Sequence, residues 1–318
     1  MPGIALVLGA GGSVGHAFHA GVLTALAEVR GWDARQADVI VGTSAGSVVT
    51  ALLRAGMPPT DLLKRGSRQP LSVEGAAIVR RAGLGPPRRR PPRPRPSGSM
   101  ASPARLARAA RAPWAVTPGS LAAAVLPVGE VPSADIAVPF DNLYGDAWPS
   151  RTTLIVAVQL DTGRRVAFGR PGAPPARVSD AVRASCAIPA YFEPVEIDGH
   201  RYVDGGVHST TNADLVAGER PDLVLVSAPM SAARGSLRFD PSSALRRFAG
   251  LSLAREVAGL RARGITVVAF QPTARDLDVM VGDALDPAKF APVSARARET
   301  VGQRLARHDV AARLAALG

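Results

Sequence analysis

A serine stands between two glycines in the segment Gly42-Thr43-Ser44-Ala45-Gly46, which has the pattern G-x-S-x-G. β-Branched residues precede this segment, and an apolar run compatible with a helix follows it. Gly42 and Gly46 would allow a tight, strained turn from strand to helix, in which the serine oxygen faces free amides and the positive end of the helix dipole. This context predicts a nucleophilic serine, although a glycine-rich turn with an inert serine would have the same five residues.

A second glycine-rich segment, Gly9-Ala10-Gly11-Gly12-Ser13-Val14-Gly15, lies between a predicted strand and a predicted helix. Glycines at such a position let several backbone amides converge on an anion. That anion is either the pyrophosphate of a dinucleotide or the oxyanion of an acyl-transfer reaction. The spacing G-x-G-x-x-x-G departs from the usual G-x-G-x-x-G, and no acidic residue ends the next predicted strand, so the dinucleotide interpretation is weakened. A purely structural turn is the remaining interpretation.

A third candidate is Asp204-Gly205-Gly206, which follows the strand-like residues HRYV. If the Asp204 carboxylate meets Ser44, it can accept the hydroxyl proton directly, and the two residues form a nucleophile and its base. Asp-Gly is also common in surface turns, so this motif alone does not establish a site.

Histidines offer a rival base. His208 could complete a triad with the serine and either Asp204 or Asp180. His16 and His19 lie beside the second glycine-rich segment. No cluster of His, Cys, Asp and Glu has metal-ligand spacing, so we do not expect a metal enzyme.

These residues need a scaffold that brings them together. Residues 3–9 and 37–42 have the pattern of buried strands, and residues 16–29 between them have the pattern of an amphipathic helix. This order predicts a parallel pair joined by a right-handed crossover. Further predicted elements are strands at 152–160, 221–229 and 264–272, a hairpin over 194–206 that turns at Asp198-Gly199, and helices at 104–111, 119–125, 178–188, 242–262 and 294–317. Alternating strands and helices predict a three-layer α/β fold with a mainly parallel sheet.

The 318 residues are expected to form a single domain, 1–318, with one insertion. Residues 84–103, LGPPRRRPPRPRPSGSMASP, combine repeated prolines with mutually repelling arginines, so they predict an irregular segment. The motifs before and after this segment must act in the same site, and we therefore interpret the segment as an insertion. The C-terminal region 294–317 is expected to be helical.

The net charge of +12 is concentrated in one part of the sequence. No acidic residue occurs between Glu74 and Glu130, whereas the interval 80–111 holds ten arginines. These arginines belong either to a solvated linker or to a surface that contacts an anionic membrane peripherally, and a nucleic acid is the less expected partner. The sequence has no basic signal-peptide start and no apolar run long enough to span a bilayer, so we expect a cytoplasmic protein, free or peripheral to a membrane. The single cysteine, Cys186, is expected to be a buried packing residue.

The three motifs occur in the order LVLGAGGSVGHAFHAGVL, VGTSAGS and IPAYFEPVEIDGHRYVDGGV, and together they resemble the patatin-like phospholipase family. The resemblance implies a three-layer αβα sandwich with a central, mostly parallel sheet, and hydrolysis of lipid acyl esters without a cofactor. It implies Ser44 as the nucleophile and Asp204 as the base, without a histidine. The implied oxyanion donors are the amides of Gly11, Gly12 and Ser13, and the motif-supporting glycines are Gly9, Gly42, Gly46, Gly205 and Gly206.

One position departs from the family pattern. Many members have Arg or Lys in the glycine-rich segment, where this chain has Val14.

The three motifs and the resemblance together predict a lipid acyl hydrolase of the phospholipase A or esterase type that uses a Ser-Asp dyad. The alternatives are a nucleotide-binding α/β protein that uses Gly9–Gly15, and a non-catalytic adaptor that binds an anionic membrane.

Overall fold

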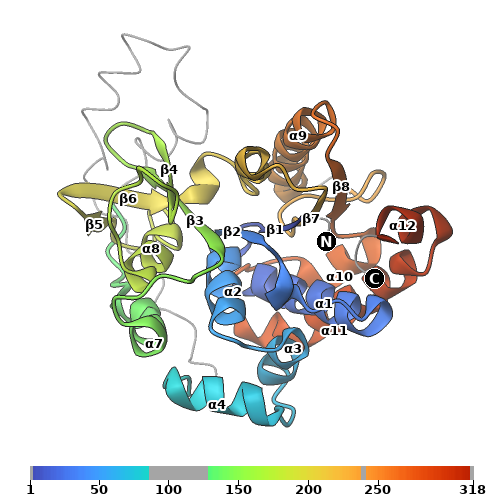
Figure 1. Cartoon of the computed structure of the whole chain (residues 1–318), viewed down its shortest axis with the longest axis horizontal. Helices are drawn as coiled ribbons and strands as arrows, with labels where there is room; N and C mark the ends of the chain where they lie inside the picture. Colours follow the sequence, from blue (N-terminus) through green and yellow to red (C-terminus); the bar gives the residue numbers. More distant parts are fainter. Residues whose placement is uncertain (1–2, 86–127, 238–240, 316–318) are drawn as a thin grey trace.

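The structure is a computed structural model that describes residues 3–85, 128–237 and 241–315. Figure 1 shows a central sheet with α1, α2, α3 and α11 on one side and α9 on the other. The predicted helices at 104–111 and 119–125 and nearly all of the predicted insertion at 84–103 lie outside the described residues.

Within the described residues the sheet has eight strands. Their bounds are β1 Ile4–Leu8, β2 Val39–Thr43, β3 Thr152–Gln159, β4 Arg165–Phe168, β5 Val195–Ile197, β6 His200–Asp204, β7 Leu223–Ser227 and β8 Thr266–Phe270. Following the hydrogen bonds gives the order β5-β6-β3-β2-β1-β7-β8, with β4 also paired to β3. The β1–β2, β1–β7, β2–β3 and β7–β8 pairs are parallel, whereas β3–β4, β3–β6 and β5–β6 are antiparallel. The expected α/β fold with a mostly parallel sheet is confirmed.

Helices connect most of these strands. The α-helices are α1 Gly12–Arg30, α2 Ala45–Arg54, α3 Pro59–Gly66, α4 Val73–Arg81, α7 Ala134–Tyr144, α8 Val178–Ser185, α9 Pro241–Arg261, α10 Ala274–Met280, α11 Phe290–Leu305 and α12 His308–Arg313. Short 3₁₀ helices are η1 Ala34–Gln36, η3 Gly205–Val207, η4 Ala213–Glu219 and η5 Pro287–Lys289.

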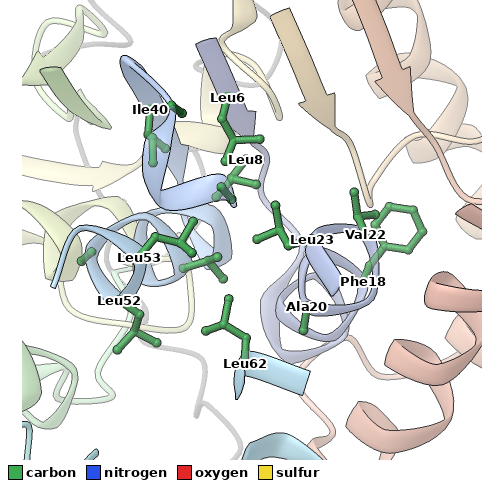
Figure 2. Close-up of a cluster of buried hydrophobic side chains, with 14 of the residues drawn as sticks. Leu6, Leu8, Phe18, Ala20, Val22, Leu23, Ile40, Leu52, Leu53 and Leu62 are labelled. Carbon is green, nitrogen blue, oxygen red and sulfur yellow. The ribbon is translucent and has the colours of Figure 1, made fainter. Parts of the chain in front are cut away.

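Alternation along the central strands divides the core between the two faces of the sheet. In β1, Leu6 and Leu8 point to the face covered by α1 and α2, where Figure 2 shows them beside Leu23 and Leu53. Ala5 and Val7 belong to a second buried cluster that includes residues of α9 and η4. Side chains at successive strand positions point to opposite faces, so one five-residue strand supplies both cores.

One edge of β3 is shared by two strands. Thr43, the last residue of β2, pairs with Val156, and Asp204, the last residue of β6, pairs with Ala157. The other edge of β3 is occupied at both positions by β4. A strand has only two edges, so β6 must continue along the edge where β2 ends. This register brings the end of β6 beside the end of β2.

The hairpin expected over residues 194–206 is formed by β5 and β6. Asp198 and Gly199 both have positive φ, 50° and 69°, as a two-residue hairpin turn of this kind requires.

Two helices differ from their expected bounds. α1 begins at Gly12 rather than residue 16, so the glycine-rich segment itself forms the first turn of the helix. The C-terminal region 294–317, which is expected to be helical, holds parts of two helices: α11 ends at Leu305, and α12 begins at His308. Arg307 has an extended backbone between them.

Helix α11 packs against α1 at Gly21. A Cβ atom at this glycine would lie 2.5 Å from the carbonyl oxygen of Ser294 and 2.7 Å from the Cβ of Ala297. The absence of a side chain therefore lets the two helices approach closely. Gly302 lies further along α11. A Cβ atom at this glycine would meet only a Val29 methyl group, at 4.0 Å.

We expect Gly21→Ala to lower the free energy of unfolding by about 1–3 kcal/mol because the added methyl group overpacks the contact between α1 and α11. Gly302→Ala is the matched control, and it should raise the free energy by about 0.5–1 kcal/mol because alanine is the better helix former. Urea denaturation measures both values. Equal effects of the two substitutions would contradict the described packing.

Candidate active site

Ser44 occupies the turn between β2 and α2 with a strained backbone. Its φ and ψ are 54° and −120°, a region that a residue with a side chain rarely adopts. Such a conformation typically costs about 1–3 kcal/mol and persists only where the surroundings enforce it. The residue is 4% exposed and stands at the N-terminus of α2. The positive end of a helix dipole favours negative charge at that position.

Close packing leaves this turn little freedom. The Ser44 amide donates a 2.9 Å hydrogen bond to the side-chain oxygen of Ser185 on α8, which in turn donates to the carbonyl of Val156 at 2.6 Å. A Cβ atom at Gly42 would lie 2.5 Å from the Thr50 hydroxyl, and one at Gly46 would overlap the carbonyl oxygen of Leu8. The two glycines of the G-x-S-x-G pattern are therefore required by the packing of the turn against β1 and α2.

Asp204 lies at the end of β6, with its carboxylate beside the Ser44 hydroxyl. The amide of Gly206 donates a hydrogen bond of 2.7 Å to this carboxylate. Asp204 is 6% exposed, and burial raises the pKa of its carboxyl group to about 6, against the Ser44 hydroxyl and the Gly206 amide, which lower it. A carboxylate with a raised pKa accepts a proton more readily than an ordinary surface aspartate.

The glycine-rich segment packs against the turn that holds Ser44 and against the residues that follow Asp204. A Cβ atom at Gly46 would approach the carbonyl oxygen of Gly9, and one at Gly206 would lie 3.4 Å from the Cβ of Ala10. Within the part of the chain that the structure describes, the amides of Gly11, Gly12 and Ser13 donate no hydrogen bond to protein. Three free amides at the N-terminus of α1 could hold an oxyanion.

Hydrogen bonds hold both ends of the peptide group between Gly9 and Ala10, which precedes these free amides. The carbonyl of Gly9 accepts a 2.8 Å hydrogen bond from Nε2 of His19, and the amide of Ala10 donates one of 2.7 Å to the carbonyl of Thr210. Nδ1 of His19 lies 2.8 Å from the hydroxyl of Ser227 at the end of β7. Burial lowers the pKa of His19 to about 4, so the ring is neutral and Nδ1 accepts from Ser227.

The histidines considered as rival bases have other surroundings. Both ring nitrogens of His19 are engaged as described above, and the ring of His16 packs edge-on against Phe290. His208 lies near Arg165 and Asp214, and burial lowers its pKa. Among the described residues, no histidine forms a hydrogen bond with the serine or with Asp204. Asp180 is in the first turn of α8.

Val14 occupies the position where many family members have a basic residue. It lies in the first turn of α1, is 3% exposed within the core, and its amide donates to the carbonyl of Ala284. Its side chain therefore contributes apolar packing, and any positive charge at this position would have to be buried.

Sequence reasoning missed two residues that position the site. Ser185 holds the strained serine, and His19 holds the glycine-rich segment. Each acts through a partner far away in the sequence, and no local pattern marks its positioning role, although Ser185 lies three residues before the segment IPAYFEPVEIDGHRYVDGGV that contributed to the family resemblance. Cys186 is buried as expected, and burial raises the pKa of its thiol to about 12.

The described residues contain no group of three or more His, Cys, Asp and Glu side chains placed to hold a metal ion. Within the same residues, no helix has both the length and the apolar character needed to cross a bilayer.

A strained serine at a strand-to-helix turn, a buried aspartate beside it and free amides near both form an arrangement typical of serine hydrolases of the α/β class. The chain belongs to the patatin-like phospholipase family, whose model matches residues 6–217. Members of this family are serine acyl hydrolases, so membership implies a lipid acyl hydrolase.

Two solved structures have a weak similarity to this chain. VipD from Legionella pneumophila is 12% identical with a TM-score of 0.40, and the match covers 96% of this chain and 66% of VipD. The type III effector protein ExoU is 18% identical with a TM-score of 0.36, and the match covers 96% of this chain and 53% of ExoU. The chain thus spans under two thirds of either protein, and these similarities are too low to carry a functional argument.

The raised pKa of Asp204 makes the stability of the protein depend on pH. The carboxyl group releases its proton at about pH 6 in the folded state and near 3.8 in the unfolded state. The folded state therefore holds the extra proton between these values, and stability falls as the pH rises from 4 to 6. We expect the free energy of unfolding of the wild type, relative to Asp204→Asn, to fall by at most about 3 kcal/mol over this range.

Urea denaturation at a series of pH values measures this difference. Ser44→Ala provides a second variant, because it removes the hydroxyl group that lowers the pKa of Asp204 and should therefore increase the loss. A difference that is constant between pH 4 and 7 would contradict the described burial of the carboxylate.

Proposed function

We propose that the protein is a lipid acyl hydrolase of the phospholipase A or esterase type, with Ser44 as the nucleophile and Asp204 as the base. The placement of the buried Asp204 carboxylate beside the Ser44 hydroxyl, where β2 and β6 end side by side on β3, is the observation that carries this proposal. Family membership supports the substrate class, and the strained backbone of Ser44 supports its role, because strain of this kind concentrates at functional sites.

The reaction proceeds in two steps. Ser44 attacks the ester carbonyl while Asp204 accepts its proton, and the amides of Gly11, Gly12 and Ser13 stabilise the oxyanion that forms. The alcohol leaves with the proton returned by Asp204, and an acyl group remains on the serine. Water then attacks the acyl-enzyme and gives a proton to Asp204, and the fatty acid is released as Ser44 recovers its proton. No metal takes part in this scheme.

Asp204 suits this role because of its surroundings. Burial raises its pKa to about 6, so at neutral pH the group is still ionised but is a stronger base than an exposed aspartate. The amide of Gly206 and the Ser44 hydroxyl orient the carboxylate. The hydrogen bonds of His19 and Thr210 to the Gly9–Ala10 peptide group support the proposed oxyanion donors, because they fix the backbone before them.

We expect Ser44→Ala to abolish hydrolysis of a soluble ester such as p-nitrophenyl butyrate and to abolish labelling by a fluorophosphonate probe. Asp204→Asn should lower kcat/KM by at least a hundredfold, because the nucleophile loses its base. His208→Ala is the control, and it should be nearly harmless. Comparing the lipid products of the wild type and Ser44→Ala would then identify the substrate.

The pH profile separates an aspartate base from the alternatives. For the wild type, kcat/KM should fall below about pH 6, where Asp204 becomes protonated. Full activity of Ser44→Ala would refute the proposal, and a large loss in His208→Ala would favour a triad over the dyad. Tight calorimetric binding of a dinucleotide would instead support the nucleotide-binding alternative for Gly9–Gly15.

The arginines between residues 80 and 111 are proposed to contact anionic membranes. Arg80 and Arg81 lie in the last turn of α4, whereas the other eight lie outside the described residues. Each basic residue near an anionic bilayer typically contributes about 1 kcal/mol.

Deleting residues 84–103 should therefore weaken association with anionic vesicles by at least tenfold while sparing turnover of a soluble ester. Co-sedimentation with phosphatidylglycerol vesicles measures the association. Unchanged association would show that the arginines serve only as a linker.

A further inference from the structure

Helix α9 has an apolar face that no described part of the protein covers. Among the described residues, seven large apolar side chains are exposed, and four of them are valines on separate elements. The other three lie within two turns of α9: Leu245 is 55% exposed, Phe248 is 49% exposed and Leu251 is 59% exposed. Single exposed apolar residues are ordinary, whereas a cluster on one helix face marks an interaction surface.

The opposite face of α9 is also apolar. Ala249, Leu253, Val257 and Leu260 are buried, the last three against the sheet. A helix that is apolar on both faces is normally enclosed on both faces. In Figure 1, however, α9 lies at the outer margin of the molecule.

Charge on α9 is almost entirely positive. Arg247 and Arg255 are exposed on the same side as the apolar cluster. The helix has one acidic residue, Glu256, whose carboxylate turns inward to accept hydrogen bonds from Ser209, Thr211 and the amide of Ala213. The outer face therefore presents apolar side chains together with arginine side chains, while the acidic side chain of the helix points inward.

The fold places this face at the same end of the sheet as the candidate active site. The chain leaves the sheet at the end of β7, passes through α9 and re-enters at the start of β8, so the first turns of α9 lie towards the carboxyl ends of the parallel strands. Ser44 follows the carboxyl end of β2 at that edge.

Direct contacts fasten α9 to the site. Arg246 donates to the carbonyl oxygens of Pro229 and Ser231 at 2.8 and 3.0 Å. The Pro229 ring packs against the glycine-rich segment, where a Cβ atom at Gly11 would lie 3.0 Å from it. Glu256 holds the loop that follows Asp204.

We propose that the outer face of α9, formed by Leu245, Arg247, Phe248, Leu251 and Arg255, docks on the surface of an anionic lipid bilayer. The apolar side chains enter the boundary between headgroups and acyl chains, and the arginines contact anionic headgroups, as in other interfacial helices. The choice of a bilayer rests on the proposed function, because a lipid hydrolase must meet its substrate at such a surface. The docking itself is measured without turnover.

A second copy of the chain fits this face less well. Three half-exposed side chains offer on the order of 300 Å², whereas a stable dimer buries about 800 Å² on each partner. The face is also positively charged, so two copies would bring like charges together.

The test is binding of the full chain to vesicles of phosphatidylglycerol and phosphatidylcholine. The triple variant Leu245→Gln, Phe248→Gln, Leu251→Gln should bind at least tenfold more weakly than the wild type. The triple variant Val29→Gln, Val73→Gln, Val138→Gln removes the same number of exposed apolar side chains from other elements and should bind like the wild type. Both variants should retain turnover of p-nitrophenyl butyrate, which shows that they are folded.

A labelling experiment locates the contact. Cys186 is buried and its thiol has a raised pKa, so a cysteine introduced by Phe248→Cys can be labelled selectively with an environment-sensitive fluorophore. The emission should shift to the blue on addition of anionic vesicles. The same label at Val73→Cys is the control and should not shift.

Three results would overturn the proposal: undiminished vesicle binding by the α9 triple variant, no vesicle binding by the wild type, or a wild-type dimer in light scattering that the α9 variant converts to a monomer. A wild type that binds vesicles through α9 but hydrolyses no ester would refute the proposed function and support the docking surface.

Discussion

The candidate site depends on how two strands share one edge of β3. β2 occupies this edge as far as Val156, and β6 continues it from Ala157 in the opposite direction. The last residues of both strands therefore meet, and the turn after β2 places the Ser44 side chain beside the Asp204 carboxylate. Because β4 takes the other edge of β3, neither strand can move aside without losing its backbone hydrogen bonds.

Around this junction, buried polar groups are held by hydrogen bonds to other polar groups of the protein. Ser185 connects the strained serine to β3, and His19 connects the glycine-rich segment to β7. Both are fully buried, where an unpaired donor or acceptor typically costs about 1–3 kcal/mol. Each link is thus costly to break, which allows the surroundings to maintain the unfavourable backbone of Ser44.

The fold class and the identity of the candidate site residues could be predicted from the sequence, because both depend on local patterns. β-Branched runs marked the central strands, Asp198-Gly199 marked the hairpin, and three glycine-containing motifs marked the site. The break between α11 and α12 could not be predicted, because no glycine or proline occurs between Leu305 and His308. The supporting roles of Ser185 and His19 depend on contacts between distant segments, which a single sequence does not reveal.

β7 lies beyond residue 217, where the match to the family model ends, yet it is paired with β1 in the middle of the sheet. Its last residue, Ser227, is also the partner of His19. A protein shortened to the matched residues would expose the edge of β1 as a template for pairing with other chains and would leave His19 without its donor. The limit of family similarity is therefore not a place where this chain can be cut, and expression of the matched segment alone should yield aggregates.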